Sequence, residues 1–236
     1  NILDNYNTIT RDTRLLSLNW NHTLSNRSFY QFTIGKFFTR EHSAVQDAMW
    51  NEYEERLDIE PINYSMDNTN MDGNIYITYG DEFYDHGFAP EWYDISSDNI
   101  RLDFDWTYHT LSKHKLKMGF EHTITDLQVL DIDEPWSGSS TFGANYDNYN
   151  AKTYFGAFYI QDKISFQGMN LNIGIRTDYW IPGRFVEDAI SDTSSIIITD
   201  EARSLFEQET FSFPWFGDSY RMKARLSPRF GISHPI

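Results

Sequence analysis

Residues 152–182 read KTYFGAFYIQDKISFQGMNLNIGIRTDYWIP. Two runs of about 11 or 12 residues, in which apolar and polar side chains alternate, flank a break that contains Gly168. Such alternation is typical of β-strands, and a short break with a glycine joins the two strands of a hairpin. A strand of a soluble sandwich usually ends after about 5 or 6 residues, whereas a tilted strand that crosses a bilayer needs about 9–11. The length of both runs therefore makes a membrane β-barrel the first hypothesis.

Five more stretches alternate in the same way, which brings the expected number of strands to about seven. The connections between successive runs are alternately short and long, so all the long ones fall at one end of the strands. Outer-membrane barrels have this asymmetry, with short periplasmic turns and longer extracellular loops, whereas a soluble sandwich has no reason for it. The further runs cover residues 8–24, 30–39, 100–109, 116–125 and 221–233, and the long connections cover residues 41–98, 126–151 and 183–220.

Some details of this pattern lead to local predictions. Within the first long connection, residues 44–57 suggest a helix and residues 75–79 a short strand. Lys36 falls among apolar positions, where its ammonium would reach for an interface or mark a bulge in the strand. Pro228 interrupts the last run, which predicts a bulge or an unpaired position.

The polar positions of the runs carry charges of both signs. A small soluble barrel fills its interior with apolar side chains, whereas a large membrane barrel has a polar lumen. We therefore expect these residues to line a lumen; the alternative is a solvent-facing side of a sheet with scattered ion pairs that contribute little individually. They are Arg101, Asp103, Asp105, Glu121, Arg176, Asp178, Arg225 and Arg229.

The composition agrees with a membrane barrel. The 15 Tyr, 18 Phe and 7 Trp suit the aromatic girdles at the two interfaces, although a lectin-like sandwich would also be rich in them. The absence of cysteine excludes a disulfide scaffold and thiol chemistry. The net charge of −16 argues against a nucleic-acid partner. Residues 41–98 hold 15 acidic residues and one basic residue, Arg56, which indicates a solvated loop or a surface that attracts cations.

Two groups of residues resemble the TonB-dependent outer-membrane receptors, and most of all their large Bacteroidetes-type branch. The first lies in the opening hairpin and consists of Tyr159-Ile160-Gln161-Asp162-Lys163-Ile164, Gly168-Met169, Asn172-Ile173-Gly174-Ile175-Arg176 and Asp178-Tyr179. The second is Leu226-Ser227-Pro228-Arg229-Phe230-Gly231-Ile232-Ser233, which is similar to the strand that follows one extracellular loop later in that family.

The resemblance implies an all-β fold, a barrel of about 22 antiparallel transmembrane strands closed by an N-terminal plug. It implies uptake of a scarce nutrient (a siderophore, cobalamin, an oligosaccharide or a peptide) across the bacterial outer membrane, with energy relayed by TonB through the plug. The expected partners are outer-membrane lipid and lipopolysaccharide, TonB and the nutrient. We expect residues 1–236 to be a mid-barrel segment of about seven strands with no plug domain, because neither a plug nor a TonB-box segment is visible.

Two kinds of candidate binding site lie in the long connections. Asn68, Asn70 and Asp72 resemble the front of a calcium loop, but Tyr79 stands where its bidentate Glu is expected, so an Asn/Gly-rich turn is the alternative and no other cofactor is expected. The second kind is a platform of aromatic rings that could stack on a ligand or pack the loops together. These residues are Trp92, Tyr93, Trp136, Tyr146, Trp215 and Phe216, with Tyr149 as a further loop aromatic.

An enzyme is not expected. Asp85-His86 and His109 near Asp105 are the only candidate acid–base pairs, and nothing resembles a nucleophile elbow. Besides a TonB-dependent receptor, two alternatives stay open: a non-transporting outer-membrane barrel that acts as a structural or secretion-associated subunit, and a soluble all-β binding protein.

Overall fold

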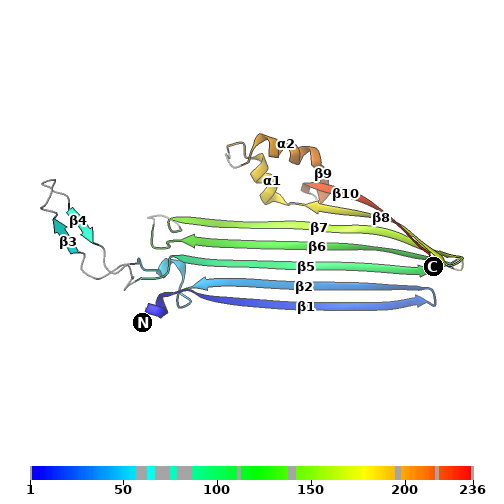
Figure 1. Cartoon of the computed structure of the whole chain (residues 1–236), viewed down its shortest axis with the longest axis horizontal. Helices are drawn as coiled ribbons and strands as arrows, with labels where there is room; N and C mark the ends of the chain where they lie inside the picture. The colour runs from blue at the N-terminus through cyan, green and yellow to red at the C-terminus, as the bar shows by residue number, and fades with distance from the viewer. Residues whose placement is uncertain are drawn as a thin grey trace. The chain divides into compact units, whose positions relative to one another are not determined.

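The computed structural model describes residues 2–56, 63–66, 75–78, 87–110, 113–137, 142–194, 198–215 and 218–234. Most of the chain is β-strand (Figure 1). The strands are β1 (Thr8–Ser25), β2 (Ser28–Ala44), β3 (Asn63–Met66), β4 (Ile75–Thr78), β5 (Glu91–His109), β6 (His114–Asp133), β7 (Asn145–Phe166), β8 (Met169–Ile181), β9 (Phe211–Trp215) and β10 (Asp218–Ser233). The helices are the 3-10 helices η1 (Ile2–Asn5) and η2 (Trp50–Glu52) and the α-helices α1 (Arg184–Ser191) and α2 (Asp200–Glu209).

Eight strands form one antiparallel sheet in the order β1-β2-β5-β6-β7-β8-β10-β9, and β3 pairs with β4 in a separate sheet. The large sheet is not closed. The all-β prediction is therefore confirmed, whereas a closed transmembrane barrel stays a prediction. The alternation of connections is also as expected, since β1–β2, β5–β6 and β7–β8 are joined by short breaks and the other long strands by long ones.

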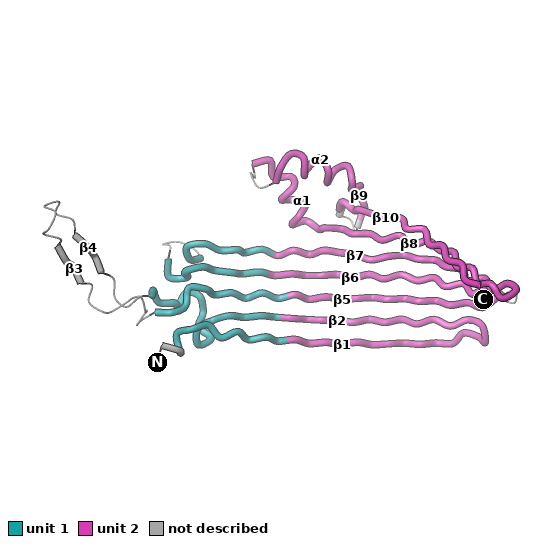
Figure 2. The backbone as a smooth tube through the Cα atoms, viewed as in Figure 1, with its two compact units in different colours: residues 1–12, 40–96, 129–149 teal, residues 13–39, 97–128, 150–236 magenta. Residues whose placement is uncertain are grey.

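The chain forms two compact units, which Figure 2 colours separately. The first unit contains residues 1–12, 40–96 and 129–149, and the second contains residues 13–39, 97–128 and 150–236. An apolar core in the first unit is built from Ala44, Val45, Tyr53, Trp92 and Ile132. In this core the hydroxyl of Tyr53 accepts a hydrogen bond from the Val45 amide at 2.8 Å.

The hairpin of residues 152–182 forms as predicted. Phe166 pairs with Met169, and the register runs without interruption to the pair Tyr154–Ile181. The two residues between the strands, Gln167 and Gly168, have φ angles of 44° and 84°. Positive φ at both central residues is the geometry of a type I′ turn, which matches the twist of the flanking strands.

Two of the predictions for the long connections are wrong. Residues 44–57 do not form a helix, because β2 continues to Ala44 and the next residues, Gln46 and Asp47, have φ angles of 53° and 59° that no right-handed helix allows. Residues 126–151 are not irregular throughout, because β6 extends to Asp133 and β7 begins at Asn145. The strand predicted at residues 75–79 is present as β4.

The third long connection contains α1, α2 and β9. The hydroxyl of Thr199 caps α2 by accepting a hydrogen bond from the Ala202 amide at 3.2 Å. Arg203 of α2 donates to the carbonyl of Ile190 in α1 at 3.0 Å, and this bond ties the two helices together.

Neither Pro228 nor Lys36 marks a bulge. Residues 223–233 of β10 pair with β8 one for one through Pro228, so the predicted bulge is wrong. Because β9 covers only residues 218–222 of β10, Pro228 lies where β10 is an edge strand, and edge strands tolerate proline. The ammonium of Lys36 lies 2.7 Å from Oδ2 of Asp98 on β5, inside an unbroken β2.

Candidate functional site

A row of six aromatic rings crosses one face of the second unit. Each ring belongs to a different strand from β1 to β8, and consecutive ring centroids are 5.5 to 6.1 Å apart. The row therefore identifies one continuous face of the sheet, which we call the apolar face. Its rings are His22, Tyr30, Phe104, Phe120, Phe158 and Tyr179.

The apolar face is nine residues tall on each of the seven long strands, which is about 27 Å at the rise of a strand. Many of its side chains are exposed, including Leu16 and Phe230 at 74%. Polar side chains such as Lys36 and Asp162 are the exceptions on this face. The segments are residues 16–24, 30–38, 100–108, 116–124, 156–164, 171–179 and 224–232.

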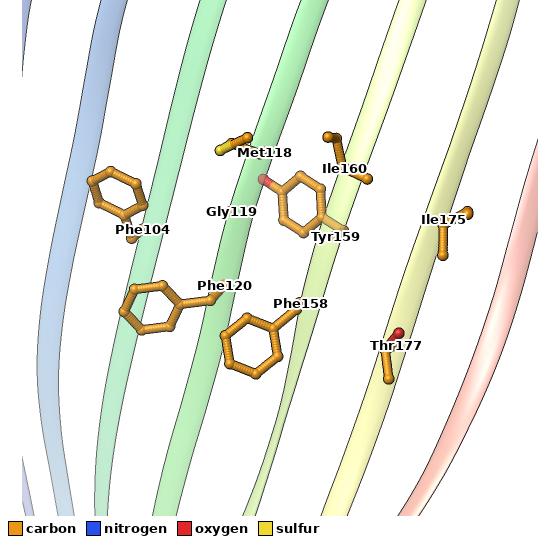
Figure 3. A pocket seen from close by; sticks show the side chains of 9 residues that line it. All are labelled: Phe104, Met118, Gly119, Phe120, Phe158, Tyr159, Ile160, Ile175 and Thr177. Atoms are coloured by element: carbon orange, nitrogen blue, oxygen red, sulfur yellow. The ribbon is translucent and has the colours of Figure 1, made fainter.

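A hollow of about 380 Å³ lies on the apolar face (Figure 3). Its lining comes from four neighbouring strands, β5 to β8, and is mostly hydrocarbon. The residues that line it are Phe104, Met118, Gly119, Phe120, Phe158, Tyr159, Ile160, Ile175 and Thr177. The hollow suits an apolar group, because most of its lining is hydrocarbon.

The opposite face of the second unit, which we call the charged face, carries a network of ion pairs. Arg176 lies at its centre, with Nη1 3.0 Å from Oε1 of Glu121 and Nε 2.7 Å from Oδ1 of Asp178. Arg101 contacts Asp103 at 2.8 Å and Glu121 at 3.8 Å. The network thus joins β6 and β8 through charge-assisted hydrogen bonds, and β5 through the longer Arg101–Glu121 ion pair.

The charged face is concave. One hollow of about 420 Å³ is lined by Gln31 and Thr33 of β2 and also by Arg229 of β10, although these two strands are not neighbours in the sheet. A single hollow thus collects side chains from six strands, as on the inside of a curved sheet. The charges in the same hollow are Arg101, Asp103, Asp105, Lys117, Glu121 and Arg176.

The eight residues predicted to line a lumen share this face. Seven belong to the network or the hollow just described, with Asp105 held by Lys117 at 3.2 Å. Arg225 stands opposite Asp178 in the ladder, and Arg229 lies four residues further along β10. That this face lines a lumen stays a prediction.

Two glycines let tyrosine rings lie flat across neighbouring strands. A Cβ at Gly119 would come within 2.7 Å of the Tyr159 hydroxyl, and a Cβ at Gly156 within 2.5 Å of the Tyr179 hydroxyl. Each would also clash with a backbone carbonyl of the adjacent strand, at 2.3 and 2.1 Å. The present alignment of β6, β7 and β8 therefore requires residues without a Cβ at positions 119 and 156.

The first unit contains an acidic hollow of about 320 Å³. Burial raises the pKa of Asp131 in this hollow, and the nearby Asp133 and Asp147 raise it further. Within the described residues no group of three His, Cys, Asp or Glu side chains is placed to hold a metal ion. The candidate calcium ligands Asn68, Asn70 and Asp72 lie outside the described residues.

Three of the aromatic residues predicted to form a ligand platform make packing or hydrogen-bond contacts in the first unit, and ligand binding by the platform stays a prediction. Trp92 is only 3% exposed and donates from Nε1 to the Ala48 carbonyl at 3.1 Å, and Trp136 packs against the same core. The hydroxyl of Tyr93 donates to Oε1 of Glu41 at 2.7 Å. Such contacts are expected if the rings pack the loops together, which was the alternative to stacking on a ligand. Tyr146 is 51% exposed and lines the acidic hollow.

Other candidates from the sequence have different outcomes. The side chains of Trp215 and Phe216 and the pair Asp85-His86 lie outside what the structure describes. Asp105 pairs with Lys117, whereas the ring of His109 stacks on Phe29 with centroids 6.5 Å apart. The structure therefore does not pair His109 with Asp105.

Sequence reasoning missed a Lys–Asp ion pair and a His–Asp hydrogen bond on the apolar face. Lys36 pairs with Asp98, and Nδ1 of His114 lies 2.7 Å from Oδ2 of Asp162. Asp98 lies two residues before the nine-residue segment of β5, and His114 lies two residues before that of β6. The sequence could have shown this, because Asp98, His114 and Asp162 lie an even number of residues from the apolar residues of their strands and therefore share their face.

Comparison of the chain with protein-family models, with curated proteins and with solved structures gave no match. Among the described residues, no helix has both the length and the apolar character needed to cross a membrane.

Proposed function

We propose that this chain forms part of the wall of an outer-membrane β-barrel of the TonB-dependent receptor type, which takes up a scarce nutrient. The observation that carries the proposal is the exposed apolar face, nine residues tall on seven neighbouring strands, with a concave charged face behind it. A transmembrane barrel has this inside-out arrangement, with an apolar outer band about 25 Å tall and a polar interior.

The exposure of the apolar face favours a lipid environment over water. Exposed apolar patches on soluble monomers rarely exceed a few hundred Å². Here half-exposed and fully exposed side chains extend from Leu16 on β1 to Phe230 on β10 without a covering layer among the described residues. Hydrocarbon chains of outer-membrane lipid and lipopolysaccharide are the partners that such a surface suits.

The charged face suits a water-filled path. Its ion pairs satisfy one another, as they would in a lumen. Because it carries charges of both signs, it leaves the nutrient class open. Uptake, energised by TonB through a plug, comes from the resemblance of residues 159–179 and 226–233 to the receptor family. A siderophore, cobalamin, an oligosaccharide and a peptide all remain candidate nutrients.

A matched pair of substitutions on β1 tests the membrane assignment. Leu18→Arg places a charge on the apolar face, and Asn21→Arg places the same charge on the opposite face three residues away. In a bilayer we expect Leu18→Arg to destabilise the folded protein by about 2–4 kcal/mol and Asn21→Arg to have little effect. Urea unfolding in lipid vesicles, followed by tryptophan fluorescence, measures both.

A soluble protein would give a different result. Leu18 is 59% exposed, so in water Leu18→Arg would change stability by no more than about 0.5 kcal/mol. That outcome, together with a monodisperse monomer in the absence of detergent, would overturn the membrane assignment. Uptake is tested separately, by comparing nutrient accumulation in the source cells with and without the gene and with TonB inactivated. Unchanged accumulation without the gene would favour a non-transporting barrel, and a loss that does not depend on TonB would overturn energised uptake.

A further inference from the structure

We propose that the hollow on the apolar face holds one acyl chain of a single phospholipid, whose phosphate lies beside His114 at the start of β6. The inference rests on the proposed membrane barrel for the leaflet that supplies the lipid. It adds to that function one lipid at one defined place on the sheet. The hollow and His114 both belong to the second unit.

The hollow lies at the middle of the apolar face. Phe120, Ile160 and Ile175, which line it, are the middle residues of their nine-residue segments. Two rungs of the β7–β8 ladder, Ile160–Ile175 and Phe158–Thr177, form part of its wall (Figure 3). At the middle of a bilayer only the ends of acyl chains are present. An unfilled hollow loses the dispersion contacts of its lining, so an acyl chain that enters it is stabilised.

A hydrogen-bonded pair of ionisable side chains lies between the hollow and the end of the sheet where short turns join the strands. Asp162 is two residues beyond Ile160 on β7, and its Oδ2 lies 2.7 Å from Nδ1 of His114. The two side chains are 31% and 37% exposed on the apolar face. Ionisable groups in contact with lipid are costly, and they are found where a polar partner meets them. His114 precedes Met118, which lines the hollow, by four residues or about 13 Å.

The short turn between β5 and β6 is basic, which matches a phosphate group. Residues 109–117 hold three lysines and two histidines and no acidic residue, in a chain whose net charge is −16. Lys113 is exposed and directly precedes His114. A long side chain at the end of a strand can extend its ammonium toward a headgroup while its stem stays against apolar surface. The charge at this end of the sheet therefore complements a phosphate.

The same end of the apolar face has the aromatic side chains of a membrane interface. Trp106 and Tyr108 on β5 stack with ring centroids 5.8 Å apart, and Nε1 of Trp106 donates to the hydroxyl of Ser28 at 2.9 Å. Such rings lie at the level of the headgroups. The short turns of an outer-membrane barrel face the periplasm. The leaflet on that side consists of phospholipid, whereas lipopolysaccharide forms the other one, so the occupant is a phospholipid.

Native mass spectrometry tests the site by counting the lipids that the protein retains. The full protein is purified from the cells that produce it and stripped of lipid in detergent, and dipalmitoyl phosphatidylglycerol is then added at a fixed detergent concentration. We expect one lipid to bind first. Dipalmitoylglycerol, which has the same chains and no phosphate, should need a concentration at least about threefold higher for half occupancy. Equal retention of the two lipids, or retention of neither, would overturn the proposal.

A matched pair of substitutions tests the tail end of the site. Ile175→Trp adds bulk in the hollow, and Ile34→Trp makes the same change at the middle residue of the β2 segment, outside the hollow. The two isoleucines are 47% and 37% exposed. We expect Ile175→Trp to raise the phospholipid concentration for half occupancy at least about fivefold, because the contacts of several methylene groups are lost together. Ile34→Trp should leave it unchanged, and equal effects of the two variants would overturn the proposal.

A second pair tests the phosphate end. Lys113→Glu reverses a charge next to His114, and Lys163→Glu reverses one on the charged face near the same end of the sheet. We expect only Lys113→Glu to weaken retention of the phospholipid, by at least about threefold. An equal loss in both variants, or a loss in neither, would overturn the assignment of the phosphate to His114. Recovery of the protein in the soluble fraction would overturn the membrane function alone, because lipid retention is measured on the purified protein.

Discussion

The hydroxyl of Tyr179 lies 2.5 Å from Nδ1 of His122, although β7 runs between the strands that carry these two residues. Tyr179 stands opposite Gly156 in the β7–β8 ladder, and only a glycine leaves room for the ring to cross β7. Tyr179 also stacks on His122 and on Phe158, with centroids 6.0 and 5.8 Å apart. One glycine thus permits a contact that holds three strands in register.

Gly156→Val is expected to destabilise the fold strongly. The new Cβ would come within 2.1 Å of the Glu121 carbonyl and 2.5 Å of the Tyr179 hydroxyl, so the strands must separate or the tyrosine must turn away. Overpacking of this kind costs about 1–3 kcal/mol. Urea unfolding in lipid vesicles measures the change, and Gly231→Val is the control, since the nearest atom to its Cβ is 3.9 Å away. Equal losses in both variants would contradict the role assigned to the Tyr179–His122 contact.

Arg176→Met is expected to cost more stability than Arg101→Met. The Arg176 side chain is 22% exposed and bridges Glu121 and Asp178, whereas that of Arg101 is 59% exposed. Exposed pairs contribute at most about 1 kcal/mol, and the loss of a more buried partner leaves carboxylates uncompensated. We expect about 1–2 kcal/mol for Arg176→Met and less than about 1 kcal/mol for Arg101→Met, in the same unfolding measurement. The reverse order would show that the network is not centred on Arg176.

The alternation of apolar and polar residues predicted the long strands, because successive side chains of a strand point to opposite faces, and here one face is apolar and the other polar. It predicted the shared face of Arg176 and Asp178 for the same reason. It could not show that Glu121 contacts Arg176, because that pairing depends on the offset between strands that are far apart in sequence. The contact of Tyr179 with His122 depends on the same offset.

The strand ends were harder to predict than the strand centres. Asn, Asp and Gly between residues 126 and 151 suggest turns, yet β6 and β7 continue through many of them. Their side chains find partners across the ladder, as where Asn150 donates to Asp126 at 3.0 Å. Similarly, apolar residues after Ala44 suggest a helix, but Val45 and Tyr53 are instead buried around Trp92. In both cases, contacts with residues distant in the sequence determined the local structure.

Trp92→Ala is expected to unfold the first unit locally, whereas Tyr146→Ala is not. Trp92 is 3% exposed in the core of that unit, and truncation of a buried tryptophan costs about 3–5 kcal/mol. Tyr146 is 51% exposed, so its loss removes little buried area. Limited proteolysis of the two variants should give early cleavage within residues 40–96 only for Trp92→Ala. Early cleavage in Tyr146→Ala as well would indicate that the acidic hollow, rather than the core, orders this segment.

Asp131→Asn is expected to stabilise the protein at neutral pH and to have no effect in acid. Asp131 lies seven residues beyond the apolar segment of β6, and burial, followed by the charges of Asp133 and Asp147, raises its pKa in the folded state. A raised pKa means that the folded protein binds the proton more tightly than the unfolded chain does. The penalty is therefore present above the folded-state pKa and disappears as the pH falls below the unfolded value near 3.8. Unfolding curves of both proteins between pH 3.5 and about 7 should converge at the acid end. A constant difference at every pH would show that the gain comes from packing of the amide, and a loss at neutral pH would show that a bound cation had satisfied the carboxylate.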